Sequence, residues 1–173
     1  MKTLLQNKKK TAISISTIRE CDFESLMSVF KHEEVGKTYM VPDLSTKEQE
    51  RLLFSRLLEL SKSGEKFVMG IFLENRLIGI INQTDLDDKI MELGYAIHPD
   101  FSGKGLMTAA LKEAISFLFK NGIEEITAGA FESNIASIRV MQKCGMKLTD
   151  KTEDIEYRGQ FHRCIFYSVK KSH

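Results

Sequence analysis

Two glycines separated by one residue, Gly103 and Gly105, lie between a predicted strand and a predicted helix. Glycines there let the backbone approach a ligand closely, and the first turn of the helix offers N–H groups and the positive end of the helix dipole. This combination favours a bound diphosphate. A tight loop without a ligand is the alternative explanation for the two glycines, so a second motif has to decide.

The glycine loop differs from two common nucleotide-binding patterns. The segment has no GxxxxGK[ST], which excludes a Walker A loop, and Thr108 stands where GxGxxG requires its third glycine. Nucleoside triphosphates and dinucleotides are therefore disfavoured as ligands.

Asn134 opens a second motif, which runs to residue 146. An asparagine at a helix N-cap accepts a hydrogen bond from first-turn N–H groups through its side-chain oxygen. The same side chain can also contact a cofactor through its amide, and the two roles are compatible. Ser137 lies one turn further on the same helix face. Lys143 is either a phosphate ligand or a solvated lysine at the helix end.

Residues 92–111 and 134–146 together resemble the GNAT acyltransferase superfamily, and within it the ribosomal-protein N-acetyltransferase (RimJ/RimL-like) branch. The order of predicted elements agrees over residues 12–169. The family's phosphate loop is written Q/R-x-x-G-x-G/A, which begins here at Ser102 and ends at Met107. Both of these end positions depart from the pattern, so a side-chain contact to phosphate is lost and the helix entry is expected to be more crowded.

The resemblance implies acetyl-CoA as the cofactor and assigns parts of the chain to it. The backbone of Ile97 and His98 is implied to pair with the pantetheine arm, and Asn134 to orient the cofactor. The implied phosphate loop starts at Ser102, and its N–H groups come from Gly103, Lys104, Gly105, Leu106, Met107 and Thr108.

The implied reaction is direct transfer of an acetyl group to a primary amine in a ternary complex. An alkyl amine with a pKa of about 10.4, or an α-amino group with one of about 7.8, is mostly protonated at pH 7 and has to lose a proton before it attacks. Glu92 is the candidate general base, directly or through water, because it lies on the predicted strand beside the cofactor arm. A strand amide near Ile97 is the candidate oxyanion donor. The alternative for Glu92 is a solvated carboxylate on an edge strand.

The departing CoA thiolate also has to be protonated, and the usual residue for this step is missing. Many family members carry a tyrosine seven residues after the asparagine, but here that position is Met141, which has no proton to donate. Ser137, Cys144 or water remain as candidates, and the alternative is that no acid is needed. Cys144 is also a candidate nucleophile, but it has no histidine at a suitable spacing, and a buried structural thiol is the alternative.

Hydrophobic periodicity predicts one α/β domain with a mixed, mostly antiparallel central sheet flanked by helices. The predicted order is β-α-α-β-β-β-α-β-α-β-β. A capping box is predicted at Ser45 and Glu48. The strands before and after the helix at 105–120 form a right-handed βαβ crossover. The predicted strands cover 13–18, 67–73, 77–81, 90–97, 124–130, 146–149 and 161–169, and the helices 22–30, 45–63, 105–120 and 134–144.

Composition limits the class of protein. A chain of 173 residues with 42% hydrophobic content fits one domain. The formal net charge of +1 gives no drive toward DNA or an anionic membrane, and no segment approaches the ~20 apolar residues of a membrane span. Three cysteines and four histidines without metal-ligand spacing predict neither a metal site nor a disulfide framework.

The ends of the chain are predicted to be flexible. Residues 1–11 and 170–173 are polar and basic, and they flank the domain at 12–169. The absence of an apolar leader at the N-terminus predicts a cytoplasmic protein. Both a monomer and a homodimer are compatible with the sequence.

The acceptor is left open by the sequence: a protein or peptide N-terminus and a small-molecule amine both remain. A set of acidic residues either attracts a cationic acceptor or forms solvated turns. Two other functions are retained, a catalytically silent acyl-CoA-binding sensor or scaffold and an RNA-associated protein that uses the basic residues 8–10. The acidic set is Asp85, Asp87 and Asp88, in the predicted loop before the strand at 90–97, together with Glu124 and Glu125.

Overall fold

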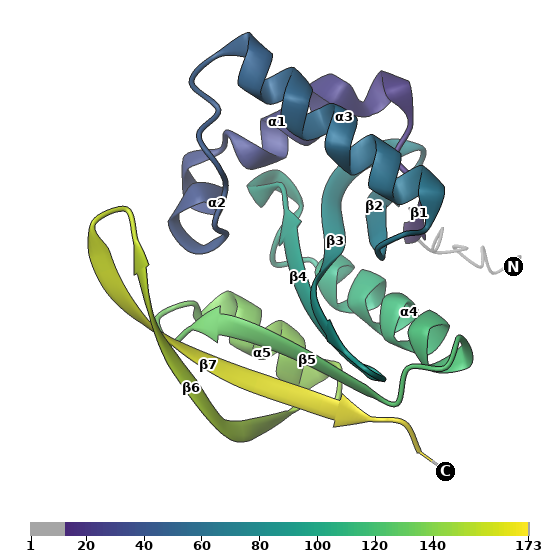
Figure 1. The fold of residues 1–173 in the computed structure, drawn as a ribbon, viewed down its shortest axis with the longest axis vertical. Helices are drawn as coiled ribbons and strands as arrows, with labels where there is room; N and C mark the ends of the chain where they lie inside the picture. The colour runs from purple at the N-terminus through teal and green to yellow at the C-terminus, as the bar shows by residue number, and fades with distance from the viewer. Residues whose placement is uncertain (1–12, 173) are drawn as a thin grey trace, which may run out of the picture.

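A computed structural model describes residues 13–172, in which seven strands form one sheet with helices on both faces (Figure 1). The order across the sheet is β1-β2-β3-β4-β5-β7-β6. The predicted flexible segment 1–11 lies outside the described residues. The strands are β1 Ile13–Ser16, β2 Val68–Leu73, β3 Arg76–Asp87, β4 Ile90–Ile97, β5 Glu125–Phe131, β6 Lys147–Tyr157 and β7 Gln160–Lys170. The helices are η1 Glu20–Asp22, α1 Phe23–Phe30, α2 Glu33–Thr38, α3 Lys47–Ser63, η2 Pro99–Phe101, α4 Leu106–Lys120 and α5 Ile135–Lys143.

The sheet is mixed, as predicted from the βαβ crossover. Strands β4 and β5, which α4 connects, are parallel, and the other neighbouring pairs are antiparallel. In the described chain the register of β4 and β5 covers residues 90–92 with 125–127 and no further. Beyond it the two strands diverge (Figure 1). The second half of each strand therefore has a main-chain edge that faces the gap.

Alternating side chains of the central strands enter two separate cores. In β4, Met91 and Leu93 belong to the core that α4 and α5 cover, whereas Ala96 belongs to the core that α1 and α3 cover. The neighbours Ile81 and Ile80 of β3 divide in the same way. The sheet thus separates two apolar layers, and the diverging ends of β4 and β5 lie between them.

Helix α2 was not predicted. It has six residues and begins after His32, whose Nδ1 accepts a hydrogen bond from the backbone N–H of Glu34 at 3.3 Å. Fewer than two full turns are too short for a periodic apolar pattern, so no hydrophobic period indicated this helix.

Two strands extend further than predicted, because their additional residues are polar. Strand β3 continues to Asp87 and β6 to Tyr157, through mostly exposed side chains. Pairing with β4 and β7, rather than an apolar alternation, forms these extensions. At the C-terminus β7 includes Lys170, and the N–H of Lys171 donates to Glu124 O at 2.8 Å, so the sheet reaches into the predicted tail.

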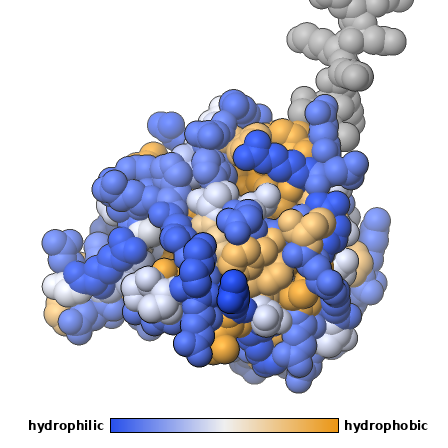
Figure 2. Space-filling view, turned by 90° about the horizontal axis from the view of Figure 1, so that it is seen from above, coloured by the Kyte–Doolittle hydropathy of each residue, from blue (hydrophilic) through white to orange (hydrophobic). Residues whose placement is uncertain are grey.

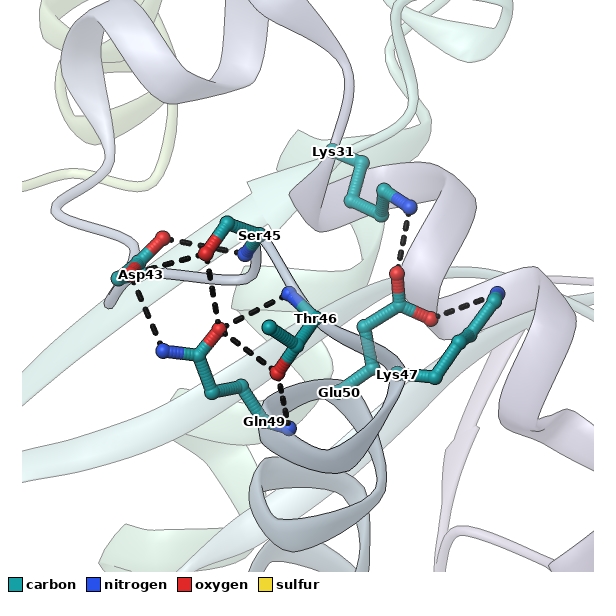
Figure 3. A network of polar contacts seen from close by, with 7 residues as sticks. All are labelled: Lys31, Asp43, Ser45, Thr46, Lys47, Gln49 and Glu50. Atoms are coloured by element: carbon teal, nitrogen blue, oxygen red, sulfur yellow. Dashed lines mark hydrogen bonds and ion pairs between the residues drawn. The ribbon is translucent and has the colours of Figure 1, made fainter.

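The predicted capping box is displaced by one residue. Thr46 is the N-cap of α3: its Oγ1 accepts from the N–H of Gln49 at 3.2 Å, and Gln49 Oε1 accepts from the N–H of Thr46 at 2.9 Å. The prediction of Ser45 and Glu48 was therefore wrong. Asp43 fixes the observed register, because its carboxylate accepts from both the Gln49 amide and the Ser45 N–H (Figure 3).

The face of the molecule seen from above is mostly hydrophilic (Figure 2). It carries a smaller hydrophobic area within a hydrophilic rim (Figure 2). None of the helices in residues 13–172 is long and apolar enough to cross a membrane.

Candidate functional site

The gap between β4 and β5 is flanked by two sets of β4 side chains. Tyr95 and Ile97 point toward the core below α4 and α5. Gly94 faces the opposite side, where a Cβ would meet Thr84 at 3.0 Å and Asn82 at 3.5 Å. Through its main chain, Ile97 pairs with β3 on one edge, while its other edge lies on the diverging side. This edge is where the pantetheine arm was predicted to pair.

The glycine loop leads from β4 into α4 through η2. Gly103 and Gly105 have φ values of +71° and +74°, in the left-handed region that favours glycine. A Cβ at either position would meet no atom within 4 Å. The space beside both glycines is therefore open, and backbone conformation is what requires glycine here.

No side chain of the described chain caps the start of α4. Gly105 is the N-cap, and the first turn of the helix contains no acidic residue. Ser102 turns its Oγ back to donate to Pro99 O at 2.7 Å, and the Lys104 ammonium donates to Asp100 O at 2.8 Å. The backbone N–H groups of Leu106, Met107 and Thr108 thus form an open donor set at the positive end of the α4 dipole.

Met107 does not crowd the entrance to α4, contrary to expectation. Its side chain is 6% exposed and belongs to the core below α4. Because the side chain turns inward, the departure from the family's small residue leaves the donor set accessible.

Asn134 occupies the predicted N-cap of α5. Its Oδ1 accepts from the N–H of Ser137 at 3.2 Å. This hydrogen bond uses the oxygen of the side chain and leaves the amide N–H groups for another acceptor. Lys143 lies in the last turn of α5 with an exposed side chain.

Tyr95 is a functional candidate that sequence reasoning missed. Its hydroxyl lies 2.7 Å from Ser137 Oγ, and it also donates to Ser137 O at 3.3 Å. Burial raises the pKa of Tyr95 well above its ordinary value, so the phenol keeps its proton at neutral pH. The alternation of β4 places Tyr95 on the core side of the strand, which the sequence could indicate. Its contact with Ser137 could not be predicted, because the two residues are 42 positions apart.

Glu92 lies at the point where the β4–β5 pairing ends, opposite Thr127. Its carboxylate accepts from Thr84 Oγ1 at 3.1 Å and from the Lys151 ammonium at 3.4 Å. The side chain is 24% exposed. Because β4 lies between β3 and β5, the alternative of an edge-strand position was wrong.

Packing confines the side chains at two further positions of the second motif. Met141 is fully buried in the core. Cys144 is half-buried, its Sγ contacts Thr108 O at 3.6 Å, and burial raises the pKa of its thiol to about 11. A thiol in this environment is a poor nucleophile near neutral pH, because the thiolate is the reactive form.

His98, at the end of β4, contacts the segment between α1 and α2 on the other face of the sheet. Its Nδ1 accepts from the N–H of Asp100 at 3.2 Å, and its ring meets the ring of His32 edge to face, with centroids 5.1 Å apart. His98 therefore contacts the segment between α1 and α2 as well as the glycine loop. Among residues 13–172, no three His, Cys, Asp or Glu side chains come together as a metal site.

The acidic residues considered for attracting an acceptor lie at the other end of β4. Glu124 pairs with Lys89 at 2.6 Å, and Glu125 with Lys170 at 3.7 Å. Asp85 and Asp87 belong to β3, not to a loop. Ion pairing compensates the two glutamates, which weakens the case for this set as an acceptor site.

The free main-chain edge at Ile97 and the uncapped start of α4 lie where the GNAT resemblance implied the pantetheine arm and the diphosphate of the cofactor. The sequence model described as Acetyltransferase (GNAT) domain matches residues 13–147, and the chain belongs to this family. Family and fold class are thus confirmed.

Known relatives agree with this assignment. The chain is 30% identical to the putative ribosomal N-acetyltransferase YdaF of Bacillus subtilis over 106 residues. This match covers 59% of this chain and 58% of the length of the relative. The solved structure of RimL, a ribosomal L7/L12 alpha-N-protein acetyltransferase in complex with coenzyme A, has a TM-score of 0.82 at 20% identity and covers 93% of this chain and 94% of that one. A GNAT acetyltransferase from Bacillus anthracis has a TM-score of 0.79 at 23% identity, with 93% and 96% covered.

Proposed function

We propose that the protein is an acetyl-CoA-dependent N-acetyltransferase that moves an acetyl group onto a primary amine by direct transfer. The observation that carries this proposal is the open set of N–H donors at the start of α4, beside the free edge of β4. Membership of the GNAT acetyltransferase family and the names of the relatives support it.

The residues present fit coenzyme A. The N–H groups from Gly103 to Thr108 are suited to its diphosphate, since donors without a side-chain cap at a helix start bind anions. The main chain at Ile97 and His98 is suited to its amide-containing arm. The Asn134 amide, which the cap leaves available, is a further donor to the cofactor. When bound, acetyl-CoA supplies the acetyl group as a thioester.

Glu92 is proposed to take the proton of the acceptor amine. The carboxylate lies where β4 and β5 separate, on the same side of β4 as Gly94. Thr84 packs so close to Gly94 that a Cβ there would meet it at 3.0 Å, so Thr84 and Asn82 line this face of β4 near the carboxylate. A base at this place would approach the amine from the side opposite α5, directly or through one water.

Ser137 is proposed to protonate the departing thiolate, with Tyr95 as its positioning residue. Tyr95 carries one proton and retains it, and its shorter contact is with Ser137 Oγ. The single phenol proton serves one acceptor at a time; when it goes to Ser137 Oγ rather than to Ser137 O, the Ser137 hydroxyl can pass its own proton to the thiolate and take one back from water. Tyr95→Phe is expected to lower kcat with little change in KM, and Ser137→Ala to lower it further. If the wild type and both variants had equal activity, Tyr95 and Ser137 would have no role in the mechanism.

The acceptor is proposed to be a protein or peptide N-terminus. Support comes from relatives that are named ribosomal N-acetyltransferases, and a ribosomal acceptor would place the enzyme in the cytoplasm. Small-molecule amines form the second arm of the acceptor screen.

Two measurements on the full chain test this function. Calorimetric titration with coenzyme A is expected to show binding, and incubation with acetyl-CoA and an amine panel is expected to release free thiol. Binding without thiol release would favour the catalytically silent acyl-CoA-binding domain. Absence of binding would contradict both functions, because the donor set at α4 would then have no such ligand.

A further inference from the structure

A pocket of ≈ 460 Å³ lies between the segment joining α1 to α2, the segment before α3 and the turn between β6 and β7. In Figure 1, α2 and this turn lie on the side toward which β4 and β5 diverge. His32 lines the pocket, and its ring contacts His98 at the end of β4. The pocket therefore adjoins the strand end at which the acetyl donor is proposed to bind.

Most charges that line this pocket already have a partner. Lys31 pairs with the buried Glu50 (Figure 3), and Glu33 pairs with Lys37 at 3.6 Å. The Asp43 carboxylate accepts hydrogen bonds from Ser45 and Gln49, all between 3.0 and 3.1 Å. These contacts leave one charged lining residue to consider.

Arg158 is the exception. Its guanidinium lines the pocket and has no hydrogen-bond acceptor and no carboxylate partner within residues 13–172. Its Cζ lies 5.2 Å from the centroid of the Tyr157 ring, and its Nη2 fills the space that a Cβ at Gly36 would need. A guanidinium offers five N–H donors in a fixed plane, and here none of them is used by the described chain.

The exposed guanidinium of Arg158 lies against α2. A Cβ at Gly36 would lie 2.7 Å from Arg158 Nη2, so the arginine occupies the space that a side chain would need. The hydroxyl of Tyr157 donates to Gly36 O at 2.7 Å, which fixes the β6–β7 turn against α2. Arg158 itself lies in this turn with a φ of 52°, in the left-handed region. The close approach of Arg158 to α2 requires a residue without a side chain at position 36, which explains the glycine within this helix.

We propose that Arg158 selects amine acceptors that carry a carboxylate close to the amine, an inference that rests on the proposed transferase function. A planar guanidinium pairs with a carboxylate through two parallel hydrogen bonds, which gives direction as well as attraction. The carboxylate comes from one of two sources: an acidic side chain next to a peptide N-terminus, or the C-terminal carboxylate of a short amino-acid-like acceptor.

Two matched substrate pairs distinguish these sources. The first pair is the tripeptide amide alanyl-aspartyl-alanine and its asparaginyl counterpart, and the second is alanyl-alanine and its amide. Thiol release from acetyl-CoA gives kcat/KM for each. For one of the pairs the acidic member is expected to be preferred by about 10- to 100-fold, the usual range for a charge-assisted hydrogen-bonded contact.

Three variants test whether Arg158 is responsible. Arg158→Gln is expected to reduce the preference to about onefold through KM, with kcat/KM for the neutral member and the Kd of coenzyme A unchanged. Gly36→Ala retains the charge but displaces the guanidinium, so it is expected to lose part of the preference. Arg56→Gln, an exposed change on α3, is the control and keeps it.

The outcomes separate this inference from the proposed function. Thiol release without a preference in the wild-type protein, or a preference that survives Arg158→Gln, overturns the role of Arg158 alone. If coenzyme A binds but no thiol is released, the transferase function fails. Calorimetric binding of the same peptides to the coenzyme A complex then decides on Arg158, because the preference must appear in their Kd values.

Discussion

Asn134 is assigned to both α5 and the cofactor, and two substitutions separate these roles. Its Oδ1 caps the helix by accepting from the Ser137 N–H at 3.2 Å. Asn134→Ala removes this cap, which costs about 1 kcal/mol of the free energy of unfolding and lowers the Tm by about 2–4 °C in a chain of this size. Asn134→Ser retains an oxygen acceptor, so its Tm is expected to stay within about 1 °C of the wild type.

The cofactor role predicts that Asn134→Ala and Asn134→Ser lose the same affinity for coenzyme A, although their Tm values differ. Both lack the amide N–H groups, and the loss of one hydrogen bond to a charged group weakens coenzyme A binding by roughly tenfold, about 1.4 kcal/mol. Calorimetric scanning gives the Tm and isothermal titration gives the Kd. Asn121→Ala at the far end of α4 is the control: it removes a donor to Phe117 O, so the Tm is expected to fall while the Kd stays constant.

Each role of Asn134 is refuted by its own result. Full coenzyme A affinity in Asn134→Ser would restrict the residue to helix capping. Equal Tm values for the alanine variant and the wild type would show that the hydrogen bond to Ser137 contributes nothing measurable to folding.

Three other predictions concern proton transfer, acid stability and thiol reactivity. Glu92→Gln is expected to lower kcat/KM by about 10²- to 10⁴-fold at pH 7 and by less at high pH, where more amine is already neutral, and an equal loss across the pH range would exclude it as the base. Hydrogen bonds and charge from Lys31 and Lys47 hold the pKa of Glu50 below its ordinary value. The stability that Glu50 contributes is therefore present above the unfolded pKa of about 4.3 and lost as the pH falls through the lowered value, so urea midpoints of Glu50→Gln are expected to vary less with pH in acid. Burial raises the pKa of Cys144 to about 11, so iodoacetamide at pH 8 is expected to label it slowly while Cys144→Ala keeps its thiol-release activity; rapid labelling or inactivity would restore Cys144 as a nucleophile.

Local chemistry accounts for the features of the site that could be predicted. The left-handed conformations of Gly103 and Gly105 and the N-cap at Asn134 depend on residues within a few positions of one another. The same is true of the end of α3 at Gly64, whose φ is 70°. Such signals are legible in a sequence because the interacting groups are neighbours in it.

The errors in the predicted helices and strands have two causes: overlapping capping patterns before α3, and the lack of a hydrophobic period in α2 and β6. The segment before α3 contains two overlapping capping-box registers, and the contact of Asp43 with Gln49 favours the later one. Helix α2 and the second half of β6 have no hydrophobic period, since the helix has six residues and the strand is largely exposed. Their formation depends on neighbours in the tertiary structure.

The sequence by itself determined the family, the glycine loop and the order of the long elements, because each follows from residues close together along the chain. The tertiary structure alone decided that Tyr95 meets Ser137, that Glu92 contacts Lys151, and that Arg158 lies over Gly36. These pairs are separated by 42 positions or more, and strand register and packing between layers bring them together. A shift of one residue in β4 would turn both Tyr95 and Glu92 to the opposite faces of the sheet.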